Sequence, residues 1–188
     1  LSADYSQQEP RILTHFAILN KNEGAENVQD AFIKGLDFHK QTAEMAGIPR
    51  RLAKTIGLGV MYGMGYKKLA VDLDISPTEA KEMLKEFRVK VPFMQGMLED
   101  VMNRANKVGT IRTFLGRKCR FDLYEPSWYE PGVFHKALPL KQAQAEYNGQ
   151  IKRAGTYKAL NRLIQGTAAD QTKKAMVDVY EKLGITPL

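Results

Sequence analysis

Residues 49–65 read PRRLAKTIGLGVMYGMG, and the rest of the sequence is best interpreted from this stretch. Arg50, Lys54, Leu58 and Tyr62 follow one another at intervals of four, which places them on one face of an α-helix. At a rise of about 1.5 Å per residue the stripe is roughly 18 Å long. Two cations stand at one end, and an apolar and an aromatic side chain at the other. An extended nucleoside triphosphate would fit this order, with its phosphates at the cationic end.

A second face of the same helix carries Ala53, Ile56 and Val60 at helical spacing, which predicts a separate core-facing side. The stripe is therefore not needed for burial, although a solvated surface face remains an alternative on these residues alone. Four glycines in the stretch each weaken a helix by up to about 1 kcal/mol. Glycines are expected where a flat or bulky group must approach the backbone closely.

Composition limits the classes of function. The 188 residues suffice for one or two domains, and 28 Lys and Arg against 21 Asp and Glu give a net charge of +7. Such a surplus favours polyanionic partners such as nucleic acid. Cys119 is the single cysteine, which excludes an internal disulfide and indicates a reducing compartment. No apolar run reaches the roughly 20 residues that cross a bilayer, and no oligomer is predicted.

The sequence predicts an α+β fold that is mainly helical. A short strand is expected to end at Asp4, and Ser76 with Glu79 forms a capping box at a helix start. Alternating apolar residues predict a β-hairpin over 109–123. Prolines and glycines make 124–149 a loop-rich excursion. Helices are predicted over residues 5–19, 27–47, 49–63, 76–89, 92–107 and 158–183.

Three segments resemble motifs of the family A DNA polymerases, the class that includes bacterial DNA polymerase I. They are DYSQQEPR (4–11), RRLAKTIGLGVMYG (50–63) and ALNRLIQGTAAD (159–170), in the expected order and with compatible spacing. The sequences of these segments most resemble the phage-type branch of the family. The resemblance implies a template-directed enzyme that transfers a nucleotide from a dNTP to a primer 3′-OH, with primer–template DNA as partner. It implies the cytoplasm of a bacterium or phage-infected host. It also implies a palm over 1–20 and 156–188 and fingers over 21–155.

The same resemblance assigns a nucleotide site. Asp4 is implied as a ligand of two Mg²⁺ ions, with the carbonyl of Tyr5 in the metal shell. Arg50 and Lys54 are implied to bind the triphosphate and assist catalysis, and Lys54 is the candidate for protonating pyrophosphate. Glu9 would exclude a 2′-hydroxyl and accept a hydrogen bond from the tyrosine of the stripe. The full set of implied dNTP-binding residues is Tyr5, Gln7, Glu9, His39, Arg50, Lys54, Leu58 and Tyr62.

The DNA contacts implied by the resemblance lie on two other segments. Asn161 and Gln165 match a polar pair that reads acceptors common to all base pairs in the minor groove. Arg112, Arg117 and Lys118 are implied to hold backbone phosphates, which position DNA without specifying sequence. Gly65 lies where the family helix ends against the template base.

Departures from the family pattern also lead to expectations. Leu58 replaces the usual Phe or Tyr, so altered discrimination at the sugar 3′ position is expected. The third family motif, His-Asp-Glu, is expected shortly beyond Leu188 and would supply the second metal carboxylate. Asp170 belongs to the palm helix motif and is no substitute. The 188 residues alone are therefore expected not to polymerise. The excursion at 124–149 is longer than in bacterial members and has no assigned role.

Two other classes stay open on the residues. The spacing Gly57-x-Gly59-x-x-x-Gly63 imitates a dinucleotide-binding fingerprint, which would indicate an oxidoreductase. That fingerprint needs a buried strand before it, whereas RRLAKTI is helical and cationic. The second class is a basic nucleic-acid-binding accessory module without catalysis. Binding alone would not require the set Asp4, Glu9 and the cationic stripe.

Overall fold

The computed structural model describes residues 4–128, 130 and 132–184. The helices are α1 (Gln8–Leu19), α2 (Ala25–Ile33), α3 (Phe38–Ala46), α4 (Arg50–Met61), α5 (Tyr66–Leu73), α6 (Pro77–Lys90), α7 (Pro92–Val108), α8 (Leu140–Glu146) and α9 (Ala159–Leu183). A 3₁₀ turn, η1 (Thr156–Lys158), precedes α9. The strands are β1 (Thr110–Arg112), β2 (Lys118–Arg120), β3 (Leu123–Pro126), β4 (Leu138–Pro139) and β5 (Ile151–Arg153).

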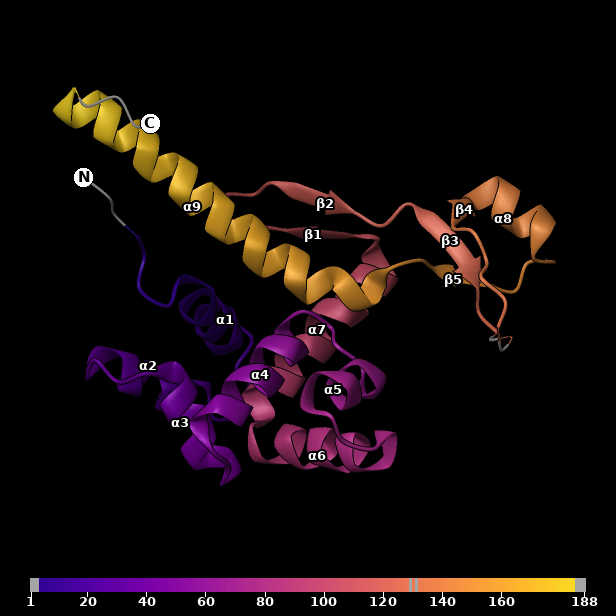
Figure 1. The fold of residues 1–188 in the computed structure, drawn as a ribbon. Coiled ribbons are helices and arrows are strands. Elements are labelled where there is room, and N and C mark those ends of the chain that lie inside the picture. Colours follow the sequence, from indigo (N-terminus) through magenta and orange to yellow (C-terminus); the bar gives the residue numbers. More distant parts are fainter. Residues whose placement is uncertain (1–3, 129, 131, 185–188) are drawn as a thin grey trace.

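The fold is α+β, as predicted, with a helical body and two small antiparallel sheets (Figure 1). Strands β1 and β2 form the predicted hairpin, in which Ile111 pairs with Cys119, and this hairpin lies along α9. The second sheet has the order β4-β3-β5 and extends with α8 away from the helical body. The long helix α9 starts against α7, contacts α1 and extends beyond the helical body.

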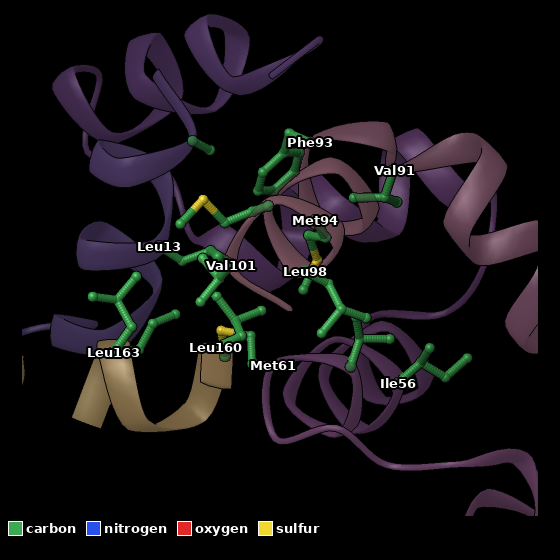
Figure 2. Packing of buried hydrophobic residues seen from close by; sticks show 14 of the residues in the cluster. Leu13, Ile56, Met61, Val91, Phe93, Met94, Leu98, Val101, Leu160 and Leu163 are labelled. Carbon is green, nitrogen blue, oxygen red and sulfur yellow. The ribbon is translucent and has the colours of Figure 1, made fainter. Parts of the chain in front are cut away.

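Helix α7 is the centre of the hydrophobic core. It contacts α1, α4, α6 and α9, and the side chains between these helices are buried (Figure 2). Leu13 of α1, Met61 of α4 and Leu160 of α9 are each fully buried in this cluster. Burial of one such side chain contributes roughly 1.5–3 kcal/mol. The core therefore fixes α4, which carries the cationic stripe, against the two segments that carry the other motifs.

Two local predictions are confirmed. Ala53, Ile56 and Val60 are buried, so α4 has the predicted core face separate from its stripe. At the start of α6 both bonds of the capping box are present: the Glu79 N–H donates to Ser76 Oγ and the Ser76 N–H donates to Glu79 Oε2. These two elements follow directly from local sequence pattern.

Other predicted boundaries are wrong. The single helix expected over 27–47 is two helices, because the chain turns at Gly35 with φ +73° and restarts at the cap Asp37. Helix α5 was not predicted. The loop-rich excursion at 124–149 also holds most of β3, together with β4 and α8, which were not predicted. The strand expected to end at Asp4 would lie on residues 1–3, which are outside the described residues, and Asp4 itself is not in a strand. Within the described residues, no helix is long and apolar enough to cross a membrane.

Candidate nucleotide and DNA site

The cationic end of the stripe is held by an acidic residue from the preceding helix. Arg50 donates from Nε to Asp37 Oδ1 at 3.0 Å and from Nη2 to Asp37 Oδ2 at 2.9 Å. The Arg50 side chain is nevertheless 54 % exposed. The Arg50 hydrogen bond is the main cause that lowers the pKa of Asp37, and the same contact raises the pKa of Arg50. The guanidinium is therefore accessible at the surface, but one of its edges already binds a carboxylate.

Lys54 and His39 complete this end of the site. Lys54 is exposed and makes no ion pair with any residue that the structure describes. His39 is only 9 % exposed, and within the described structure its Nδ1 has no hydrogen-bond partner. Burial lowers the pKa of His39; Asp37 opposes this, and the charges of Arg50 and Lys54 lower it further. We call these four residues, Asp37, His39, Arg50 and Lys54, the phosphate-end cluster.

The other end of the stripe joins three helices. The Tyr62 hydroxyl donates to Glu9 Oε2 at 2.5 Å, so the hydrogen bond expected from the resemblance is present. Burial and this bond raise the pKa of Tyr62 to about 12, while the Gln165 side chain acts in the opposite direction. Leu58, between the two ends, is half-buried against the core. Side chains from α1, from the end of α4 and from α9 thus meet at one place.

Asp4 and Tyr5 precede α1 and are both exposed. Gln7, in a left-handed conformation with φ +52°, connects this segment to the phosphate end. Its Oε1 accepts a 2.8 Å hydrogen bond from the N–H of Phe38, the first residue of α3. Helix α3, whose cap residue Asp37 binds Arg50, is therefore hydrogen-bonded to the segment that carries Asp4.

Gln8 fixes the opposite side of the same segment, although the resemblance assigned it no role. Its Nε2 donates to the Ala168 carbonyl and to Gln171 Oε1, both at 3.2 Å, on α9. Three consecutive side chains at the start of α1 therefore bind different elements: Gln7 binds α3, Gln8 binds α9, and Glu9 binds Tyr62 at the end of α4. The start of α1 is positioned by all three parts of the site.

The glycines of the stripe helix allow close approach, but the approaching groups belong to the protein. A Cβ on Gly63 would lie 2.8 Å from the Tyr157 carbonyl oxygen, and one on Gly59 would collide with the Met64 side chain. Gly63 also has φ +73°, which L side chains rarely adopt. A Cβ on Gly65 would meet nothing within 4 Å. Of Gly59, Gly63 and Gly65, therefore, Gly65 before α5 is the glycine that leaves open space for an approaching group, as expected from the sequence.

The basic residues of the β1–β2 hairpin are used differently from the expectation. Arg117 donates from Nε to Asp170 Oδ1 at 2.8 Å and from Nη2 to the Gly166 carbonyl at 2.7 Å, both on α9. Arg112 donates to the carbonyl of Gly116 within the hairpin turn. Lys118 is exposed. Arg117 therefore attaches the hairpin to α9 in this structure, and its predicted phosphate contact would have to use the remaining guanidinium edge.

The polar pair on α9 lies one turn apart. Gln165 is exposed and reaches the Tyr62 end of the stripe, whereas the Asn161 Oδ1 is buried without a hydrogen-bond partner among the described residues. An unpaired buried amide oxygen costs about 1–3 kcal/mol, which is often tolerated where a ligand completes the bonding. Because they are four residues apart, the two amides lie on one face of α9, and Gln165 on that face reaches the stripe.

Comparison with known proteins identifies the family. A sequence model of DNA polymerase family A matches residues 1–187. The chain belongs to DNA polymerase family A. The relatives include a DNA-directed DNA polymerase of Pseudomonas phage M6, 33 % identical over 96 % of this chain and 30 % of its own length. DNA polymerase I of Pseudomonas aeruginosa is 34 % identical over 95 % of this chain and 18 % of its own.

A solved structure agrees with this family A assignment. The POL domain of Pol1 from M. smegmatis, in complex with DNA primer-template and dNTP, superposes with a TM-score of 0.69 and 30 % identity. The match covers 97 % of this chain and 30 % of that chain. This family A chain therefore spans less than a third of the length of these relatives.

Sequence reasoning missed three residues that the structure places in the site. Asp37 lies two residues before His39, but its spacing gave no sign that it would bind Arg50. Gln8 lies in the first motif, but the resemblance assigned it no role. Asp170 was assigned to the palm helix motif without its partner in the hairpin.

Proposed function

We propose that this chain provides the nucleotide-binding fingers and part of the palm of a template-directed DNA polymerase. Residues 1–20 and 156–188 would belong to the palm and residues 21–155 to the fingers. The observation that carries the proposal is the arrangement of α4. It has the phosphate-end cluster at its start and the Glu9–Tyr62–Gln165 group at its end. The relative whose name includes primer-template DNA and dNTP supports the same partners here.

At the phosphate end, Arg50 and Lys54 would bind the triphosphate of the incoming dNTP. Their charge would stabilise the negative charge that develops as pyrophosphate leaves, so the catalysis is chiefly positioning and electrostatics. Lys54 is the better proton donor to pyrophosphate, because its ammonium is exposed and has no ion-pair partner in the described structure. His39, kept neutral by burial, would contact a phosphate through a ring nitrogen.

At the other end, Glu9 would lie beneath the sugar and exclude a 2′-hydroxyl. Tyr62 fixes the Glu9 carboxylate by its hydrogen bond, and its ring would stack near the nascent base pair. Asn161 and Gln165 would contact the minor groove of the primer–template, where shared acceptors allow a check of geometry without sequence preference. Gly65, with open space above it, would face the template base.

The candidate metal site offers donors of the kind that Mg²⁺ prefers, but the described residues supply only part of the number that two ions need. The Asp4 carboxylate and the Tyr5 carbonyl are the hard oxygen ligands that Mg²⁺ prefers. No group of three His, Cys, Asp or Glu side chains that could hold a metal occurs among the described residues. Two Mg²⁺ ions, when bound, would stabilise the entering and leaving oxygens. The second carboxylate would come from another part of the polymerase, and we expect residues 1–188 alone not to polymerise.

The test is calorimetric titration of the 188-residue chain with dATP and MgCl₂. Arg50→Ala and Lys54→Ala should each weaken binding about tenfold or more, because each removes a charge-assisted contact. Lys85→Ala is the matched control, since this exposed α6 lysine has only a 3.8 Å contact with Glu82. Equal affinities in all three variants would contradict the proposal. Retained primer–template binding with no dATP binding would favour the accessory module instead.

A further inference from the structure

Asp37 performs two tasks with one carboxylate. Its Oδ1 accepts the Lys40 N–H at 2.8 Å and so caps α3, and the same carboxylate binds Arg50 through both oxygens. The cap fixes Asp37 to α3 independently of the arginine. Asp37 is only partly exposed, with 34 % of its side chain accessible, against 54 % for Arg50.

The two partners therefore differ in mobility. An N-cap aspartate that leaves its helix would abandon a backbone donor, so Asp37 stays in place. Arg50 is a long, exposed side chain whose only side-chain hydrogen bonds among the described residues are those to Asp37, so it can move away at little cost. Any anion that binds Arg50 through Nε and Nη2 must take the edge that Asp37 now occupies.

We propose that Asp37 is an internal competitor for the triphosphate: it binds Arg50 in the absence of nucleotide and is displaced when the phosphates arrive. This inference rests on the proposed function of Arg50 and Lys54. The pair holds the guanidinium against the cap residue of α3. It also sets a threshold, because an arriving ligand must make contacts beyond Arg50 to outweigh the loss of the two Arg50–Asp37 hydrogen bonds. A polyphosphate meets this requirement by binding Lys54 at the same time, whereas a single phosphate does not.

The test uses inorganic tripolyphosphate and, separately, orthophosphate, titrated calorimetrically into the 188-residue chain at low salt. Asp37→Asn keeps the cap oxygen for the Lys40 N–H and removes the charge. We expect it to bind tripolyphosphate about two- to fivefold more tightly than the parent chain, as expected for release of a surface ion pair. The gain should shrink as salt is added. Orthophosphate should show weak binding to the parent chain and a larger relative gain in the variant.

Controls separate competition from other effects. Glu82→Gln removes the same charge from the exposed surface of α6 and should leave the affinity nearly unchanged. Asp37→Ser is a second variant that retains a cap and removes the carboxylate. In an Arg50→Ala background, Asp37→Asn should give no gain, because the competed group is gone.

The outcomes are distinguishable. If Arg50→Ala does not weaken tripolyphosphate binding, the proposed function fails. If Arg50→Ala weakens it but both Asp37 variants bind with unchanged or lower affinity, competition is refuted, while the triphosphate site stands. A gain of equal size in Glu82→Gln would likewise refute the inference, since it would reflect net charge alone.

Discussion

Replacing Gly63 by alanine tests how the end of α4 is positioned. Gly63 follows the tyrosine of the stripe, and a Cβ there would lie 2.8 Å from the carbonyl oxygen of Tyr157, next to α9. Cβ atoms essentially never approach an oxygen so closely, and this oxygen belongs to backbone that cannot rotate away. Gly63→Ala must therefore either separate the turn after α4 from η1 or distort that turn.

The magnitude has two parts. A left-handed backbone costs an alanine about 1–2 kcal/mol, and overpacking typically costs about 1–3 kcal/mol. Gly63→Ala should thus lower the free energy of unfolding by about 2–5 kcal/mol. Gly35 is the matched control: it has the same φ of +73°, and a Cβ on it would meet nothing within 4 Å. Gly35→Ala should therefore show only the strain of about 1–2 kcal/mol.

The assay is equilibrium unfolding of the two variants and the parent chain in urea, followed by circular dichroism. The slope of free energy against urea should be unchanged, which would show that the same two states are compared. The difference between the two variants isolates the collision with Tyr157. Equal destabilisation of both variants would refute the reasoning, because it would mean that the turn after α4 and η1 are not in contact in solution.

Three further predictions concern charged and titrating groups. Tyr62 should ionise near pH 12 in a ¹³C-tyrosine NMR titration, and Glu9→Gln should lower that pKa while burial keeps it above 10; no change would show that the carboxylate does not affect the phenol. Asp170→Asn should lower the free energy of unfolding by about 1 kcal/mol, because the ion pair of Asp170 with Arg117 holds the hairpin on α9. Asp72→Asn, which breaks an exposed pair with Lys68, should change the free energy of unfolding little. Equal effects of the two substitutions would contradict the role of the hairpin contact. Burial lowers the pKa of His39 below its ordinary 6.5, so the unfolded chain binds the proton first as the pH drops. The free energy of unfolding therefore falls as the pH drops through 6.5 toward the lower native pKa. His39→Gln should reduce the dependence of the urea midpoint on pH between about pH 7.5 and 5, and an unaltered dependence would rule out this contribution.

Features with a local period could be predicted from the sequence. The stripe and core face of α4 follow from spacings of three and four, and the capping box of α6 from two residues three apart. The β1–β2 hairpin follows from alternation around Gly116. Each of these patterns is decided by neighbours along the chain, so tertiary packing did not override it.

The short strands and the helix inside the loop-rich excursion were not predicted, because its prolines were interpreted as breakers of regular structure. Pro139 lies in β4, an edge strand, where a missing N–H can face solvent without loss of a ladder bond. Pro126 is the last residue of β3, where the ladder ends. Proline therefore excludes only the interior of a sheet, and the short strands of this excursion have little interior.

Contacts between elements could not be predicted, and they decide how the site is held. Arg50 and Asp37 are 13 residues apart and on different helices, so no helical period relates them. At the other end of α4, the hydrogen bond from Tyr62 to Glu9 spans 53 positions. The first contact is an exposed ion pair that salt and ligands weaken; the second lies beside a glycine packed against backbone. The sequence could identify both ends of α4 because they carry polar side chains, but only the structure shows that one end is held by an exposed ion pair and the other lies against backbone. On the proposed function, this asymmetry would place the adjustable part of the site at the guanidinium and would leave the proposed sugar and base end firmly held, as selection of a nucleotide by shape requires.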